Sequence, residues 1–317
     1  MKYVGLAYIL ASVFSFIISL VYWRSFKSTI NVDIKDFESG KAKELFQMGG
    51  WLSLGRIGTL MLVSMDIYIF NLFFDLAISG SFGAITQLLN VLRVGVGLIS
   101  GILIPVIIIH YSKGEFAEIA DTVKASILLI LYPISVLVSV LFIFSQEILT
   151  LWLGIQFAEY SLLLKLLTVS VLFSLPVNVL FAIFTAYNKV KTPGKLQFLF
   201  GIAHLLLSLI FIKFTNLSFY SIPISGIIIA FCKNIIIIPV YASKIMGLPV
   251  AEFLFPLVKG LCFFVTSILA TWVISSLFSI QLLSHVIILT ACLFIVQSLV
   301  VYIIDRSFFI RLKFLLK

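Results

Sequence analysis

The chain has 317 residues, of which 62% are hydrophobic and only 11% are charged, and its mean hydropathy is +1.23. These values exclude an ordinary soluble domain, in which roughly 45–50% of residues are apolar and about 25% are charged. With 31 Phe and three Cys, the composition also excludes a disordered protein and one built on disulfides. At about 20 apolar residues per membrane span, the apolar residues suffice for nine spans. The composition therefore predicts a polytopic membrane protein.

Apolar runs bounded by charged residues, Gly or Pro predict nine transmembrane segments. The expected spans are 3–23, 50–74, 82–109, 125–144, 163–187, 196–212, 219–241, 255–278 and 283–304. Runs of this length fit helices rather than barrel strands, because lipid offers the backbone no hydrogen-bond partners. The predicted fold class is all-α, a membrane helix bundle.

The Lys and Arg residues outside the spans predict the orientation of the bundle. Sixteen of them fall in one set of loops, and three (Lys2, Lys165 and Lys213) fall in the alternate set. By the positive-inside rule the first set is cytoplasmic, so the C-terminus lies inside and an odd number of spans places the N-terminus outside. The net charge of +9 is then mostly a topology signal, and we expect no nucleic-acid partner. An outside N-terminus with no signal-peptide pattern predicts a chain whose upstream part is absent.

The longest cytoplasmic segment joins the first two spans, from residue 24 to residue 49. It mixes acidic residues and lysines with spaced apolar residues such as Phe37 and Leu45. One interpretation is an amphipathic helix on the membrane surface, interrupted at Gly40. The other is a solvated linker between two membrane units.

Four ionisable residues fall well within the predicted spans, away from their ends: Arg56, Asp66, Arg93 and Lys233. Each costs roughly 2.5–3.5 kcal/mol near the bilayer centre, so a specific environment must offset the cost. Helical spacing places Arg56 and Asp66 on one polar stripe of the second span. It places Arg93 and Asn90 on a stripe of the third span.

Each stripe has two interpretations. Its Gly, Ser and Thr residues fit a seam of small residues against a neighbouring helix. A guanidinium near mid-depth favours a water-filled lumen instead, with Gln87 at its edge. Such a lumen would carry a formal charge of +2, which favours an anionic group such as a phosphate or a pyrophosphate. For Asp66, a hydrogen bond within the bundle and a role in coupling to a proton or cation are both open. Lys233 either lines the lumen or extends to the cytoplasmic face.

Residues typical of catalysis are sparse. The three histidines, His110, His204 and His285, fall in three different spans, so we expect no metal site and interpret them as hydrogen-bonded or interfacial. The chain has no phosphate-binding Gly-rich loop, no nucleophile elbow and no HExxH motif, and its predicted outer loops are short. We therefore expect neither a cofactor nor an enzyme.

Several stretches resemble bacterial polysaccharide-repeat-unit flippases, which belong to the multidrug/oligosaccharidyl-lipid/polysaccharide exporter superfamily. They are GGWLSLGRIGTLMLVSMDIYIFNLFF, SGSFGAITQLLNVLRVGVGLISGILIPVIIIHYSKGE, ILTLWLGIQFAE and LPVNVLFAIFTAYNKVKTPGK. The resemblance implies two six-helix lobes around a central cavity, with two further helices at the C-terminus. It implies that residues 1–23 are the last helix of an otherwise missing N-lobe and that 24–49 are the inter-lobe linker. Residues 50–241 would be the C-lobe, and 242–317 the two extra helices with a basic tail.

The leading hypothesis is a flippase in the bacterial plasma membrane that moves undecaprenyl-pyrophosphate-linked oligosaccharide by alternating access. Arg56, Arg93 and Lys233 would attract the pyrophosphate, and Asp66 would couple transport to an ion. The missing N-lobe, or self-association, would complete the cavity within the membrane lipid. The alternatives are a cation-coupled multidrug exporter of the same superfamily, a membrane enzyme acting on the same lipid, and a truncated remnant without activity.

Overall fold

The computed structural model describes residues 2–25, 37–277 and 280–305. These residues form helices and short connections and no strand. Nine helices among them are long and apolar enough to cross a membrane, and each overlaps one of the nine predicted spans. The predicted all-α membrane bundle is confirmed. The orientation of its termini stays a prediction.

The chain divides into two units, Met1–Gln47 and Met48–Lys317. The first unit contains α1 (Lys2–Ser25), whose apolar side chains from Gly5 to Trp23 are all exposed. A helix that is apolar on every side suits a lipid environment.

Helix α2 (Ser39–Val63) begins in the first unit and continues into the second. The predicted interruption at Gly40 is wrong, because the helix includes this residue in its first turn. Two contacts support the start of the helix: the Ala42 amide donates to the Glu38 carbonyl, and the Lys41 Nζ lies 2.9 Å from the Glu38 carboxylate. Residues 26–36 of the predicted linker lie outside the described residues.

The second unit contains the remaining helices. They are α3 (Met65–Phe73), α4 (Leu76–Lys113), α5 (Phe116–Ile143), α6 (Ser145–Leu153), η2 (Ile155–Tyr160), α7 (Ser161–Ser174), η3 (Pro176–Val179), α8 (Leu180–Ala186), α9 (Lys191–Phe214), η4 (Ser218–Tyr220), α10 (Ser221–Ala230), η5 (Phe231–Ile237), α11 (Ile238–Met246), α12 (Ala251–Leu277) and α13 (Leu283–Ile304).

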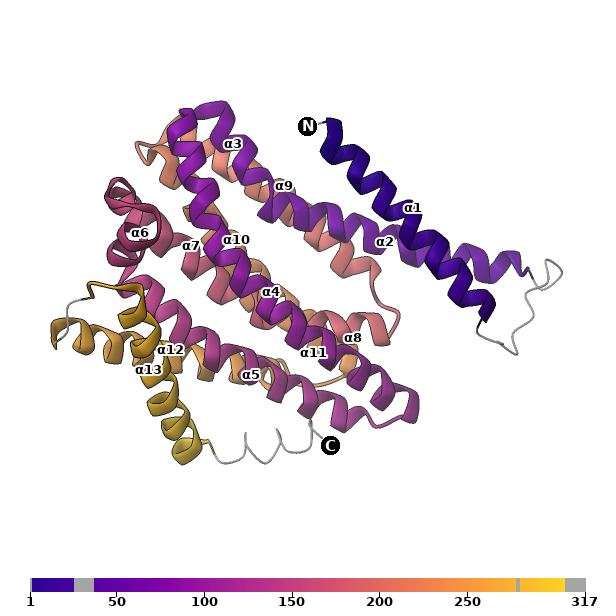
Figure 1. Ribbon diagram of the computed structural model, residues 1–317. Coiled ribbons are helices and arrows are strands. Elements are labelled where there is room, and N and C mark those ends of the chain that lie inside the picture. The colour runs from indigo at the N-terminus through magenta and orange to yellow at the C-terminus, as the bar shows by residue number, and fades with distance from the viewer. Residues whose placement is uncertain (1, 26–36, 278–279, 306–317) are drawn as a thin grey trace. The chain divides into compact units, whose positions relative to one another are not determined.

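Helix α5 forms the centre of this unit. It runs beside α4 and α12 (Figure 1) and also packs against α7 and α13. The close approach of α12 depends on Gly260, since a Cβ there would lie 2.3 Å from the Leu131 Cδ1. The side chains of Ile127, Leu131 and Val138 are almost completely buried in the resulting apolar core.

Three polar contacts connect α5, α12 and the end of α13. Asp305, at the end of α13, accepts a hydrogen bond from the Tyr132 hydroxyl at 3.0 Å and lies 2.6 Å from the Lys259 Nζ. In the first turn of α12, Glu252 lies 2.7 Å from the Lys124 Nζ on α5. The predicted basic tail, residues 306–317, lies outside the described residues.

Three irregular segments interrupt the spans of the second unit. The helix breaks at Ser64 between α2 and α3, and a 3-10 turn follows α7 from Pro176. The π-helix η5 precedes Pro239, which sits in the first turn of α11 and cannot donate a backbone hydrogen bond. Such π-segments are frequent at functional sites, and residues from η5 line the cavity described next.

Candidate functional site

The second unit encloses a cavity of about 660 Å³. Helices α2, α3, α4, α7, α9 and α10, together with η3, α8 and η5, contribute to its walls. Its charged or titratable side chains are Arg56, Asp66, Arg93, His204 and Lys233. All four ionisable residues that the sequence places inside spans thus border one cavity. Three cations and one carboxylate give it a formal charge of +2 when the imidazole is neutral.

Lys233 reaches the cavity from the π-helix η5 and is buried, with 7% of its surface exposed. Its Nζ donates to the Gln197 Oε1 at 2.9 Å, and the Gln197 Nε2 donates to the Thr59 hydroxyl at 3.1 Å. This chain of hydrogen bonds joins η5, α9 and α2. The alternative in which Lys233 extends to the cytoplasmic face is wrong, because its ammonium group is held inside the bundle.

Glycines bring α2 and α9 together beside this chain of hydrogen bonds. A Cβ at Gly58 would lie 2.4 Å from the Gln197 carbonyl carbon, and one at Gly194 would lie 2.4 Å from the Trp51 carbonyl oxygen. The two backbones are therefore in direct contact, as in a small-residue seam. The two interpretations of the α2 stripe, a small-residue seam and a lumen lining, therefore describe neighbouring faces of the helix. Gly58 packs on α9, and Arg56 lines the cavity.

Asp66, in the first turn of α3, is bonded to a histidine. The His204 Nε2 on α9 lies 2.8 Å from the Asp66 Oδ1, and the His204 Nδ1 lies 3.1 Å from the Ser225 hydroxyl on α10. The imidazole is 1% exposed. The hydrogen-bond alternative for Asp66 is therefore what the structure shows, and the expectation of a satisfied His204 is confirmed. A role of Asp66 in ion coupling stays a prediction.

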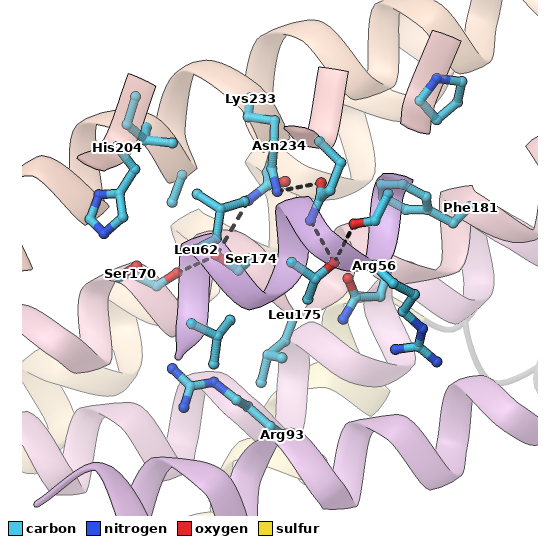
Figure 2. A pocket seen from close by; sticks show the side chains of 18 of the residues that line it. Arg56, Leu62, Arg93, Ser170, Ser174, Leu175, Phe181, His204, Lys233 and Asn234 are labelled. Atoms are coloured by element: carbon cyan, nitrogen blue, oxygen red, sulfur yellow. Dashed lines mark hydrogen bonds between the residues drawn. The ribbon is translucent and has the colours of Figure 1, made fainter. Parts of the chain in front are cut away.

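Arg93 reaches the cavity from α4, on the side opposite Lys233 and Asn234 (Figure 2). Its Nη1 donates to the Asn90 Oδ1 at 2.7 Å, within the same helix. Asn90 and Gln87 do not line the cavity: Asn90 orients Arg93 from one turn away, and the Gln87 side chain is exposed. Their predicted contact with a cargo stays a prediction.

Arg56 lines the cavity from α2, the helix that also contributes Trp51. The side chain of Arg56 is exposed, and among the described residues no carboxylate lies within ion-pair distance of it. The Lys191 and Lys195 ammonium groups lie 5.4 Å and 5.3 Å from the centre of the Trp51 ring, which also lines the cavity. This part of the cavity, around Trp51, is rich in positive charge.

Helix α9 contributes polar residues to the site that were not predicted from the sequence. Gln197, His204 and Ser208 are spaced by seven and four residues, so they share one face of a helix. All three are buried and bonded to other helices in the structure. This periodic set of polar residues in an apolar span was the available signal.

Comparisons with known proteins add a relative and a fold. No family model matches the chain. The chain is 32% identical over 245 residues to the "uncharacterized membrane protein EpsK" of Bacillus subtilis strain 168. The match covers 75% of this chain and 46% of EpsK, so the chain spans less than half of that relative's length.

A solved structure decides the fold. The crystal structure of the Vibrio cholerae MATE transporter VcmN in the bent form superposes with a TM-score of 0.54 at 20% identity, over 76% of this chain and 58% of VcmN. The chain has a MATE transporter fold. The nine helices among the described residues that are long and apolar enough to cross a membrane, together with this fold, support a multi-pass membrane protein. At 20% identity the likeness concerns the fold, and the cargo has to be argued from the cavity.

Proposed function

We propose that this chain is part of a flippase that moves lipid-linked oligosaccharide across the bacterial plasma membrane for cell-surface polysaccharide biosynthesis. The observation that carries the proposal is the charge of the cavity. Arg93 and Lys233 face it from opposite sides, while Asp66, the one carboxylate among the described lining residues, is bonded to His204. Positive charge is therefore left for a cargo, and a pyrophosphate provides the matching negative charge.

The size of the cavity fits the headgroup rather than the whole lipid. A volume of about 660 Å³ lies within the usual range for small-molecule sites, roughly 300–1,000 Å³. A pyrophosphate with its first sugars would occupy this space, and the prenyl chain would remain in the bilayer. Polar side chains such as Ser170, Asn178 and Asn234 border the cavity and offer hydrogen bonds to sugar hydroxyls.

The proposal also assigns the parts of the chain. Residues 1–23 correspond to the last helix of an N-lobe, 24–49 to the inter-lobe linker, 50–241 to the C-lobe, and 242–317 to two extra helices. An N-lobe, or a second copy of this chain, would face the C-lobe across the cavity. Rocking of the two halves would open the site to each side of the membrane in turn.

A binding experiment tests the cargo. The purified chain in lipid nanodiscs is titrated with radiolabelled undecaprenyl pyrophosphate. Arg93→Ala is expected to weaken binding about tenfold to a hundredfold, because a hydrogen bond to a charged group contributes about 1.5–3 kcal/mol. Lys213→Ala is the matched control, since Lys213 is exposed and lies outside the cavity. Equal affinities for the two variants would overturn the proposal.

A cation-coupled multidrug exporter of the same superfamily is the second candidate. It is favoured by the fold shared with a MATE transporter and by the presence of Asp66 in the cavity. The same nanodisc preparation distinguishes the two candidates when it is titrated with a fluorescent lipophilic cation. A drug exporter would bind the cation in a manner lost in Asp66→Asn, whereas a pyrophosphate site would bind it weakly in both proteins.

A further inference from the structure

Asp66 and His204 form a buried pair that connects distant parts of the chain. The Asp66 Oδ1 and the His204 Nε2 are 2.8 Å apart, and the two residues are 138 positions apart in the sequence. The carboxylate comes from the first turn of α3, directly after the break at Ser64, and the imidazole comes from the middle of α9. Both residues line the charged cavity, although 9% of Asp66 and 1% of His204 are exposed.

The second nitrogen of His204 enters a chain of hydroxyl groups. The Ser225 hydroxyl lies 3.1 Å from the His204 Nδ1, 2.8 Å from the Ile222 carbonyl oxygen, and within hydrogen-bond distance of the Ser208 hydroxyl. Ser208 and Ser225 are completely buried. The imidazole is therefore hydrogen-bonded at both nitrogens, and its partners on the Nδ1 side can each donate or accept.

This arrangement offers hydrogen-bond partners to His204 in two protonation states. In the neutral imidazole, Nε2–H donates to Asp66, the Ser225 hydroxyl donates to Nδ1, and the Ser208 hydroxyl donates to Ser225. In the imidazolium, an Nδ1–H bond has formed and donates to the Ser225 oxygen, whose hydrogen has turned to the Ile222 carbonyl. One proton is gained from solvent, and among these groups the only rearrangement is the rotation of the Ser225 hydroxyl. Histidine is the side chain whose unperturbed charge changes near neutral pH.

The surrounding charges decide when the proton is bound. The charged groups that border the same cavity as His204 are Asp66 on α3, Arg56 on α2, Arg93 on α4 and Lys233 on η5. Helix α10, which supplies Ser225, has no titratable side chain. An anion that entered the cavity would screen the three cations, and proton binding would become more favourable.

We infer that Asp66 and His204 form a proton-loading pair, which takes up one proton when the anionic headgroup enters the cavity and releases it when the headgroup leaves. The inference rests on the proposed function and names its coupling ion. Uptake of the proton raises the formal charge of the cavity from +2 to +3 and strengthens its electrostatic attraction for the anionic headgroup. The Asp66 contact, which joins α3 to α9, is kept in both protonation states, so the pair changes its charge without separating these helices.

The donor set favours a proton over a metal cation. Among residues 2–25, 37–277 and 280–305, no group of three or more His, Cys, Asp or Glu side chains is placed to hold a metal ion. Hard cations take six or more oxygen ligands, often from several carboxylates. Here one carboxylate faces an imidazole nitrogen.

The chain allows His204 to be observed alone. It has three histidines, and His110→Gln/His285→Gln leaves His204 as the single one. His110 pairs with Glu115 at 2.7 Å, so Gln keeps a hydrogen-bond donor there. In nanodiscs with 15N-labelled histidine, nuclear magnetic resonance spectroscopy measures the fraction of imidazolium against pH, with and without farnesyl pyrophosphate as the anionic probe.

Three results are expected. His204 titrates between the two states, farnesyl pyrophosphate raises its imidazolium fraction at a fixed pH, and Asp66→Asn lowers that fraction in the absence of probe. Ser225→Ala, which leaves the Asp66 pair in place, lowers it as well because the Nδ1–H loses its acceptor. Replacing sodium by potassium changes nothing.

Several outcomes would overturn the inference. One is an imidazole that stays neutral across the pH range in which the protein is folded, and another is a fraction unaffected by Asp66→Asn and Ser225→Ala. Displacement of the proton by sodium would assign a metal site instead. If the probe binds with no change in His204, the proton pair is wrong and the proposed function stands. If His204 responds to Asp66 but no pyrophosphate binds, the cargo is wrong and the proton pair stands without its trigger.

Discussion

The two walls of the cavity are built in different ways. On the wall formed by α2 and α9, the backbones touch at Gly58, and hydrogen bonds cross from helix to helix through Gln197. On the wall formed by α4, a Cβ at Gly97 or Gly101 would meet nothing within 4 Å, and Arg93 bonds to Asn90 on its own helix. The first wall is held by tertiary contacts and the second presents its charge with local support. We interpret the first as the fixed side of the site and the second as the side that contacts a mobile cargo.

The largest effect, on thermal stability, is expected on the wall formed by α2 and α9. Gly58→Ala places a methyl group 2.4 Å from the Gln197 backbone, and neither backbone can move without separating α2 from α9. Overpacking of this kind costs about 1–3 kcal/mol or more, so thermal unfolding in detergent should occur several degrees lower. The matched control on the other wall is Gly95→Ala, where nothing lies within 4 Å. Equal unfolding temperatures for the two variants would contradict the contrast between the walls.

An intermediate effect, with opposite signs for binding and stability, is expected at Lys233. Lys233→Met removes a buried ammonium group that donates a hydrogen bond to the neutral amide of Gln197. Binding of undecaprenyl pyrophosphate should weaken about tenfold or more, while thermal stability is kept or raised, as at sites where function opposes stability. A purely structural role predicts the reverse: unfolding at a lower temperature with unchanged affinity. Differential scanning fluorimetry and the binding titration together distinguish the two.

The smallest effect on the affinity is expected on the wall formed by α4. Asn90→Ala removes the hydrogen bond at 2.7 Å that orients the Arg93 guanidinium and leaves the charge in place. The affinity for pyrophosphate lipid should fall a few-fold, in keeping with a hydrogen bond worth about 0.5–1.5 kcal/mol. Gln87→Ala, one turn away and exposed, should leave the affinity unchanged. A larger loss from Gln87→Ala than from Asn90→Ala would place the cargo elsewhere on α4.

The fold was largely predictable because lipid imposes a simple rule on sequence. Apolar runs of about 20 residues must be helices, and all nine expected spans overlap helices of the structure. The ends of the helices were less predictable. Helix α2 begins at Ser39 rather than near Gly50, because a helix can extend into the polar residues that precede an apolar span. The π-helix η5 could not be predicted, because it depends on how Pro239 and its neighbours pack.

The cavity was predictable in its charges and not in their partners. A charged side chain is costly anywhere in the bilayer core. The presence of Arg93 and Lys233 in apolar spans therefore already indicated a polar environment inside the bundle. Arg93 bonds to Asn90 on its own helix, whereas Lys233 bonds to Gln197 on α9, whose other partner, Thr59 on α2, is 138 positions away in the sequence. His204 was placed correctly as a satisfied histidine, but its pairing with Asp66 required the packed helices.

The central claim is that the charged cavity holds the pyrophosphate of a lipid carrier. It is tested most directly by photo-crosslinking with a prenyl pyrophosphate that carries its photoreactive group next to the phosphates, followed by mass-spectrometric mapping. The account predicts labelling of residues that border the cavity, such as Ser170 and Asn178, and loss of this labelling in Arg93→Ala or with excess unlabelled lipid. Labelling confined to exposed apolar faces, such as Leu98 and Ile102 on α4, and unchanged in Arg93→Ala, would contradict it.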